Sequence, residues 1–307
     1  MKIFTNKIKE NWVVDKFILE WEEHNSGYIT DKIKKSDIIW IIAPWTWNKT
    51  KKKYLDSKKV LCTIHHIDFE KFDSIEEKNF YERDGFVNEY HVISEITKNQ
   101  LSKLTDKKIS VAPFWIDEST FFNIKNKEQL RKKYEIPEEA FIIGSFQRDT
   151  EGFDLKTPKL SKGPDIFFEI VKEKLRENNN TKVLLAGTRR QYLINLFKEN
   201  NIPYYYFEMA SYKELNELYN LLDLYIVSSR VEGGPRSIFE SAVTKTPIIS
   251  TNVGFASEIL SPNSIFKINE HQKAYPDVNY AFEKVQNIKI PNGFLPFIDI
   301  FKDLYES

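Results

Sequence analysis

Short apolar runs rich in β-branched and aromatic residues alternate along this chain with longer charged stretches of helical periodicity. No other feature of the sequence constrains the fold as much. The alternation is typical of α/β domains built on parallel sheets, because a crossover between parallel strands needs a segment about as long as a helix. We therefore expect parallel sheets flanked by helices.

The alternation falls into two series. The first predicts strands at 2–4, 37–42, 59–64, 90–93 and 109–111, with helices at 13–23, 75–82 and 95–104. After a polar segment, the second predicts strands at 141–145, 182–186, 204–207, 224–227 and 247–250, with helices at 164–177, 190–199, 212–222 and 235–244. The chain of 307 residues suits two domains. We place them at 1–120 and 121–292.

The final stretch, 293–307, predicts an amphipathic helix. Its apolar residues recur at helical spacing: Phe294, Leu295, Phe297, Ile298, Phe301 and Leu304. Such a helix must bury its apolar stripe against another element. We expect it to cross back and complete the N-terminal domain.

The composition excludes several classes of protein. The 45 basic and 45 acidic residues cancel, so nucleic acid is disfavoured as a partner. Cys62 is the single cysteine and cannot form an intramolecular disulfide, which fits a reducing compartment. We find neither a signal-peptide pattern nor an apolar run of roughly 18 residues. We expect a cytoplasmic protein whose contact with the inner membrane face, where it exists, is peripheral.

The segment 228–242, S-S-R-V-E-G-G-P-R-S-I-F-E-S-A, carries the clearest functional signal. A buried strand ends there, Gly233 and Gly234 let the backbone approach a ligand, and Pro235 suits the first turn of a helix. Free amides and the positive end of the helix dipole would face an anion at the carboxyl edge of the sheet. The segment predicts an anion site; the alternative is an ordinary strand-to-helix turn.

Within this segment, Glu232 and Glu240 form an E-x7-E pair inside the pattern S-x3-E-G-x-P-x4-E-x-A. The pattern resembles the retaining glycosyltransferases of family 4, which have the GT-B fold: two Rossmann-like domains facing an interdomain cleft. Further matching segments are V-I-S-E at 92–95, the stretch 109–121, I-G-S-F-Q-R at 143–148, K-G at 162–163 and L-A-G at 185–187. The resemblance covers roughly residues 59–260.

The resemblance implies a retaining transfer of a sugar from a nucleotide-diphosphate sugar to a glycan, lipid-linked or other hydroxyl acceptor. Arg148 and Lys162 would neutralise the diphosphate and stabilise the departing nucleotide. Glu240 would accept hydrogen bonds from the ribose, and Glu232 would lie beside the transferred sugar, with His65 completing the catalytic set. The implied donor-binding positions also include Gly187, Met209, Gly233, Gly234, Pro235, Arg236 and Ser237.

Missing motifs and departures from the family pattern add three expectations. The sequence lacks a D-x-D pair, a P-loop, a dinucleotide fingerprint and an H-E-x-x-H motif, so we expect no required metal and no cofactor besides the donor. The segment T-N-K-I-K at 5–9 replaces the family's glycine-rich loop, which leaves open a non-catalytic sugar-nucleotide-binding or partner subunit. An insertion at 149–161 separates Arg148 from Lys162 and predicts a lid or a binding loop specific to this protein.

Aromatic residues and histidines mark the predicted acceptor side. Trp45 and Trp47 follow an apolar strand, where their rings could stack on a sugar; core packing is the alternative. His65 follows the next strand at the place of the family's T-x-H, and His66 is a lesser candidate on the acceptor side. A purely structural role for the histidine pair is the alternative.

Overall fold

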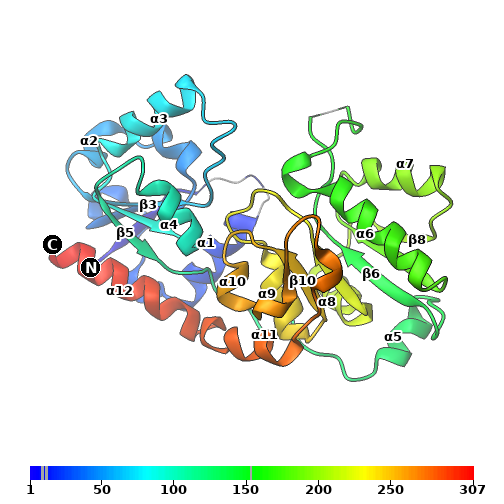
Figure 1. Cartoon of the computed structure of the whole chain (residues 1–307). Helices are drawn as coiled ribbons and strands as arrows, with labels where there is room; N and C mark the ends of the chain where they lie inside the picture. Colours follow the sequence, from blue (N-terminus) through cyan, green and yellow to red (C-terminus); the bar gives the residue numbers. More distant parts are fainter. Residues whose placement is uncertain (8–9, 11–12, 153) are drawn as a thin grey trace. The chain divides into compact units, whose positions relative to one another are not determined.

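The computed structural model describes residues 1–7, 10, 13–152 and 154–307. The chain divides into two compact units, residues 1–115 with 290–307 and residues 116–289. We call them the N-terminal unit and the C-terminal unit, and Figure 1 shows both. This division lies a few residues from the boundaries proposed from the sequence.

The N-terminal unit contains five parallel strands in the order β1-β2-β3-β4-β5. They are β1 (Ile3–Thr5), β2 (Ile38–Ile41), β3 (Lys59–Ile64), β4 (Glu89–Val92) and β5 (Lys108–Val111). The helices are α1 (Val13–His24), α2 (Lys52–Leu55), α3 (Ser74–Asp84), α4 (Glu95–Leu101) and α12 (Leu295–Glu306). Every strand predicted from the first series is present, within one or two residues. The short α2 lies in a lysine-rich segment that carried no helix prediction.

The two faces of this sheet bury different side chains, because successive residues of a strand point to opposite sides. Ile39 and Ile41 of β2 join a largely aliphatic core with Phe80 of α3 and Leu101 of α4. Trp40, between them in the sequence, lies on the other face within an aromatic cluster. Its ring centroids are 5.1–6.5 Å apart, and its members are Trp21, Trp40, Trp115, Phe297 and Phe301.

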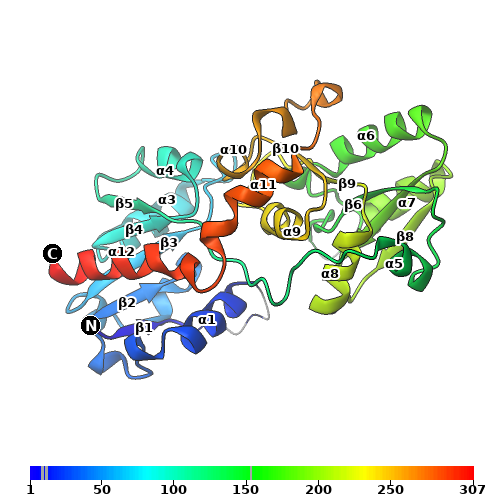
Figure 2. The same ribbon diagram turned by 90° about the horizontal axis from the view of Figure 1, so that it is seen from below.

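The last two rings of this cluster come from α12. Figure 2 shows α12 lying along the sheet of the N-terminal unit, with α1 close by. Its stripe of Phe297, Ile300, Phe301 and Leu304 is buried. The expected return of the C-terminal helix is thus observed, and the apolar periodicity of 293–307 explains it.

The C-terminal unit contains six parallel strands in the order β11-β10-β9-β6-β7-β8. They are β6 (Phe141–Ser145), β7 (Thr181–Ala186), β8 (Tyr204–Phe207), β9 (Leu224–Val227), β10 (Ile248–Thr251) and β11 (Ile265–Phe266). The helices are α5 (Lys127–Lys133), α6 (Pro164–Glu177), α7 (Gln191–Glu199), α8 (Tyr212–Leu221), α9 (Arg236–Thr244), α10 (Ala256–Ile259) and α11 (Val278–Lys284). The short elements α5, α10, α11 and β11 were not predicted. No helix in the described part of the chain is long and apolar enough to cross a membrane.

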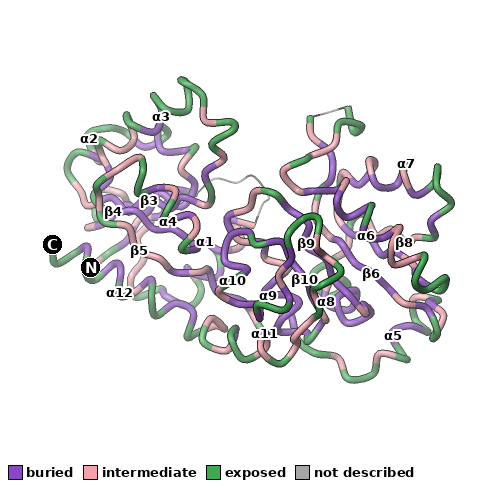
Figure 3. The backbone as a smooth tube through the Cα atoms, in the orientation of Figure 1, coloured by how far each residue is buried: buried purple, intermediate pink, exposed green. Residues whose placement is uncertain are grey.

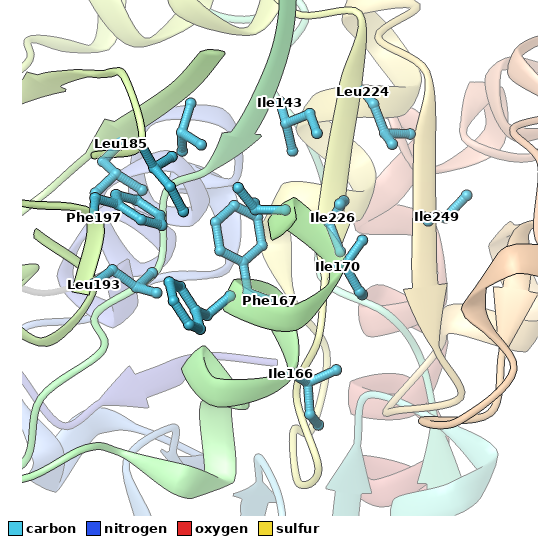
Figure 4. Packing of buried hydrophobic residues seen from close by; sticks show 14 of the residues in the cluster. Ile143, Ile166, Phe167, Ile170, Leu185, Leu193, Phe197, Leu224, Ile226 and Ile249 are labelled. Atoms are coloured by element: carbon cyan, nitrogen blue, oxygen red, sulfur yellow. The ribbon is translucent and has the colours of Figure 1, made fainter. Parts of the chain in front are cut away.

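One core cluster of this unit forms between the sheet and two of its helices. Figure 4 shows Ile143 and Ile226 of neighbouring strands close to Phe167 and Ile170 of α6, and Leu185 of β7 beside Phe197 of α7. Burying a side chain of this size contributes roughly 1.5–3 kcal/mol. In Figure 3 the strands are mostly buried, whereas exposed residues gather on loops and on outer helix surfaces.

The strand order of the C-terminal unit creates a topological switch point. The chain runs from β6 outward through β7 and β8, then returns to the other side of β6 and continues through β9, β10 and β11. The loops that leave β6 and β9 therefore diverge at neighbouring carboxyl ends. Open α/β sheets bind ligands at such a point.

Candidate functional site

Two glycines bring the loops together at this switch point. Gly163 has φ +60, and a Cβ there would lie 1.9 Å from the carbonyl oxygen of Ser228. Gly254 has φ +53, and a Cβ there would lie 2.2 Å from the carbonyl oxygen of Gly233. Only glycine fits both the left-handed conformation and the close approach. The segments before α6 and after β10 can consequently lie against the loop that follows β9.

Backbone hydrogen bonds hold the first of these contacts. The amides of Arg230 and Val231 donate to the carbonyl of Ser161 at 2.8 and 3.1 Å. The Ser228 hydroxyl donates to the carbonyl of Gly163 at 2.8 Å. The turn that carries Lys162 is thus fixed against the segment that carries Glu232.

Lys162 and Glu232 meet directly. The Lys162 Nζ donates to Glu232 Oε1, and the two side chains are 25% and 12% exposed. The Ser229 Oγ lies 3.1 Å from Glu232 Oε1 and 3.3 Å from Gln147 Oε1. The Gln147 Nε2 donates to the carbonyl of Lys162 at 3.0 Å. A cation and a carboxylate therefore share one partly open site, cross-linked to the end of β6.

Gln147 had not been singled out from the sequence. It stands within the matched segment I-G-S-F-Q-R, directly before Arg148. Arg148 is exposed and forms no hydrogen bond or ion pair with another described residue. The structure thus connects the end of β6 with the Lys162 turn through Gln147, and leaves the Arg148 guanidinium available to a ligand.

Glu240 lies in the middle of α9 and contacts two side chains. The Tyr219 hydroxyl donates to Glu240 Oε2 at 2.6 Å, and the Arg236 Nε lies 3.6 Å from Glu240 Oε1. Burial, with the nearby Glu240 carboxylate, raises the pKa of Tyr219 well above its ordinary value. Tyr219 thus stays protonated and keeps donating to Glu240.

The other residues of the predicted donor site follow strand ends or begin α9. Pro235 is the N-cap of α9, one position earlier than the sequence suggested, and Ser237 is hydrogen-bonded to Tyr225. Gly187 follows β7 with φ +89, and Met209 follows β8 with 82% of its surface exposed. All of these residues lie in segments that leave the carboxyl ends of strands of one sheet.

The insertion at 149–161 folds back on itself. Thr150 and Pro158 form an antiparallel bridge, and the amide of Glu151 donates to the carbonyl of Thr157 at 2.8 Å. The amide of Lys159 donates to the carbonyl of Asp149 at 2.8 Å. Residue 153 lies outside the described residues. The hairpin therefore brings the two ends of the insertion together. Arg148 and Lys162 directly flank these ends, although thirteen residues separate them in sequence.

In the N-terminal unit, His65 follows β3. Its Nε2–H donates to the carbonyl of Ile42 at 2.8 Å, and burial lowers the pKa of His65 to about 4. The ring is therefore neutral near pH 7, with Nδ1 as a hydrogen-bond acceptor. It lies 6.0 Å from the Trp45 ring, while the neighbouring His66 is exposed.

The two tryptophans after β2 have different environments. Trp45 is 43% exposed, whereas Trp47 is 6% exposed and packs in the core, 5.8 Å from the Phe86 ring. Both belong to a 3₁₀ turn, Pro44–Lys49, in which residues two apart point in different directions. The prediction that Trp47 lines an acceptor site is therefore wrong, and the core alternative applies to it.

The loop after β1 closes through a side chain. The Asn6 Nδ2 donates to Thr46 Oγ1 at 2.6 Å, and the Asn6 amide donates to the carbonyl of Trp40 at 3.3 Å. Residues 8 and 9 of the segment 5–9 lie outside the described residues. The amide of Asn6 thus links the ends of β1 and β2, where the family has a glycine-rich loop.

Comparisons with known proteins bear on the family and on the fold. The family model for glycosyl transferases group 1 matches residues 126–284. The O-antigen biosynthesis glycosyltransferase WclY of Escherichia coli is 23% identical over 225 residues, which are 72% of this chain and 58% of WclY. The match thus spans less than two thirds of the length of that relative.

Solved structures share the fold. HepE from Anabaena, in complex with UDP-glucose, superposes with a TM-score of 0.73 at 13% identity and covers 99% of both chains. Sucrose-phosphate synthase from Thermosynechococcus elongatus gives 0.71 at 14% identity, over 98% of this chain and 81% of that one. A glycosyltransferase from Rickettsia africae gives 0.61 at 21% identity, over 98% and 84%. The expected pair of Rossmann-like domains of the GT-B type is confirmed.

Proposed function

Because the chain belongs to the glycosyl transferases group 1 family, we propose that it transfers a sugar from a nucleotide-diphosphate sugar to a hydroxyl acceptor. One observation carries the proposal: at the switch point between β6 and β9, Lys162 pairs with Glu232, and Gln147, which precedes the exposed Arg148, donates to the carbonyl of Lys162. The UDP-glucose complex of the structurally similar HepE supports a nucleotide-sugar donor.

The diphosphate would lie between the two cations. Arg148 offers a planar fork suited to two phosphate oxygens, and Lys162 offers a compact charge. The amides at the start of α9 add a favourable dipole for an anion. Lys162 is paired with Glu232. A bound diphosphate would share Lys162, leaving the Glu232 carboxylate to accept hydrogen bonds from sugar hydroxyls.

The transfer would proceed with retention at the anomeric carbon. The bond from that carbon to the diphosphate oxygen breaks, and a bond to the acceptor oxygen forms on the same face. The acceptor's proton passes to the departing phosphate, and Arg148 and Lys162 stabilise the charge of this leaving group. Glu240, held by Tyr219, would bind the ribose hydroxyls. His65 would accept a hydrogen bond from a sugar hydroxyl at Nδ1, which the Ile42 contact leaves unprotonated.

The acceptor would be a glycan, a lipid-linked saccharide or another hydroxyl compound bound by the N-terminal unit. Trp45 supports this assignment, since it combines an exposed ring with an indole N–H that lies 3.3 Å from Glu10 Oε1. Rings and carboxylates of this kind suit the apolar faces and hydroxyls of sugars. Together with the exposed His66, which follows His65, these residues form the proposed acceptor side. We place the reaction in the cytoplasm, with peripheral contact at the inner membrane face for a lipid-linked acceptor.

A panel of nucleoside diphosphates and nucleotide sugars tests the proposal. A ligand present at 100 times its Kd stabilises the native state by about 2.7 kcal/mol, so the correct base should raise the Tm. Release of the nucleoside diphosphate in the presence of an acceptor then measures turnover. Binding without turnover across a broad acceptor panel would indicate the non-catalytic subunit instead. No Tm change with any nucleotide would contradict both.

A further inference from the structure

A buried ion pair adjoins the proposed donor site and has no role in the chemistry described so far. Arg190, the N-cap of α7, is fully buried, and its Nε lies 3.4 Å from Oδ2 of Asp149, which is 2% exposed. Removing such ions from water is costly, and their attraction offsets this cost only when further contacts hold both groups. The contacts of the pair therefore indicate what it holds.

The Arg190 guanidinium donates hydrogen bonds to the end of β6 and to the residues that follow it. Its Nη1 donates to the carbonyl of Gln147, and its Nη2 donates to Ser145 Oγ at 3.3 Å. These two acceptors and the ion-pair partner Asp149 come from alternate residues of one short segment, 145–149. A planar fork of five donors can reach all three, which an apolar side chain could not do.

The Asp149 carboxylate is fixed from the other side. It accepts hydrogen bonds from the amides of Tyr192 and Leu193 at 3.3 and 3.4 Å, in the first turn of α7. The amide of Asp149 donates to the carbonyl of Arg189 at 3.0 Å. The residues on both sides of Arg148 are thus tied to the start of α7.

Arg148 itself is exposed, so the pair fixes its backbone and leaves its side chain free to meet a ligand. Gln147, held by Arg190 at its carbonyl, also reaches the carbonyl of Lys162 through its side chain at 3.0 Å. Fixing a long side chain at its base reduces the freedom that it loses on binding. The same ion pair therefore fixes the position of the Arg148 backbone. It also fixes the orientation of the segment 147–149 relative to Lys162.

We propose that Arg190, together with Asp149, is a positioning residue for the donor diphosphate and acts by holding the segment 147–149. This inference rests on the proposed function, because it assumes that Arg148 binds a diphosphate. It predicts that Arg190 influences ligand binding through Arg148 and not independently of it.

A double-mutant cycle tests this coupling. The probe is UDP, or the nucleoside diphosphate that gives the largest Tm increase in the panel, and its Kd is measured by calorimetry. Arg190→Met should weaken binding about tenfold in the wild-type background and less than twofold in the Arg148→Ala background, because neighbouring residues that act together are not additive. Arg190→Lys should restore most of the affinity, since its ammonium can still donate to the Gln147 carbonyl.

A merely structural pair predicts a different pattern. It would lower the Tm of Arg190→Met but leave the Kd of the folded protein unchanged, or weaken binding by the same factor with and without Arg148. Either result overturns the inference. Should Arg190→Met fail to fold, Asp149→Asn enters the same cycle and must show the same dependence on Arg148. A folded wild type that binds no nucleoside diphosphate would overturn the proposed function, and this inference with it.

Discussion

The two units share a parallel-sheet architecture but differ in the residues that line the ends of their strands. All six tryptophans lie within residues 1–115, whereas seven of the ten glycines lie within 116–289. At the strand ends of the N-terminal unit, rings and the Asn6 side chain join neighbouring segments. In the C-terminal unit, Gly163 and Gly254 let backbones touch, and charged side chains occupy the space between the loops.

The buried polar groups differ in the same way. In the N-terminal unit, His91 is buried and neutral, because burial lowers its pKa to about 3. In the C-terminal unit, Asp149 faces Arg190, and burial raises the pKa of this carboxyl to about 6 against the opposing effect of Arg190. The N-terminal unit thus buries neutral histidine rings beside carboxylates such as Glu89, whereas the C-terminal unit buries the Asp149–Arg190 ion pair at the proposed donor edge of its sheet. We take this difference as the physical basis for assigning the donor to the C-terminal unit.

The largest expected effect is a loss of stability on replacing Trp47 but not on replacing Trp45. Trp47→Ala removes a core side chain and should lower the free energy of unfolding by about 3–5 kcal/mol. Trp45→Ala removes a partly exposed ring and should change stability by less than about 1 kcal/mol, while raising the KM for the acceptor. Denaturant melts followed by tryptophan fluorescence measure this, because every tryptophan belongs to the N-terminal segment.

Donor affinity is the control for both variants. It should be unchanged in Trp45→Ala, since the proposed donor contacts are in the C-terminal unit. A large loss of stability in Trp45→Ala would remove its acceptor assignment. Equal stability of the two variants would contradict the environments described for them.

A smaller effect is expected on the pH dependence of stability, through His91. Its folded pKa is depressed, so the unfolded chain binds a proton below pH 6.5 while the folded chain stays neutral, and stability falls as pH drops toward 3. Between pH 7 and pH 5 this should cost about 2 kcal/mol. His91 donates from Nε2 to the carbonyl of Ala112 at 2.8 Å, a bond that Gln can imitate.

The variant His91→Gln should therefore lose less stability over the same pH range, whatever its stability at pH 7. Exposed His66 offers the matched control, and His66→Gln should keep the wild-type slope. Identical pH slopes for wild type and His91→Gln would show that His91 is not buried as described. Asp149 acts in the opposite sense, because its folded pKa is raised above the usual 3.8: the stability it contributes is present at low pH and is lost as pH rises through about 6.

For the removal of metal ions we expect no effect at all: the rate of turnover should be unchanged in EDTA. The sequence lacks a D-x-D pair, and two cations are already available for the leaving group. Among the described residues, no three His, Cys, Asp or Glu side chains gather where they could hold a metal. Loss of activity in EDTA that Mg²⁺ or Mn²⁺ restores would assign the leaving-group charge to a metal instead.

The sequence predicted the long elements well because their apolar spacing is strong. The predicted limits of α6 coincide with those observed, and its buried face explains why. The short α5 was missed, since its seven residues lie in a polar segment and depend on the Asn126 cap, whose side chain accepts from the Gln129 amide at 2.9 Å. Propensity and periodicity say little about elements of that length.

The site was predictable only in part. The resemblance singled out Lys162 and Glu232 for separate parts of the donor, and the ion pair between them was not predicted. The roles of Gln147 and Arg190 depend on contacts across 15 and 43 residues of sequence, which no local pattern records. Trp47 was misassigned because the direction of a side chain in a 3₁₀ turn depends on the core beneath it. Contacts of this kind arise from tertiary packing.

The most direct test of the central claim is the affinity of one nucleoside diphosphate, measured by calorimetry, for the wild type and three variants. Arg148→Ala and Lys162→Ala should each weaken binding by roughly 1.5–3 kcal/mol, the scale of a charge-assisted hydrogen bond. The matched control, Arg176→Ala, removes an exposed arginine at the far end of α6 and should bind like the wild type. If both site variants also bind like the wild type, the diphosphate does not lie at the β6–β9 switch point, and the account is contradicted.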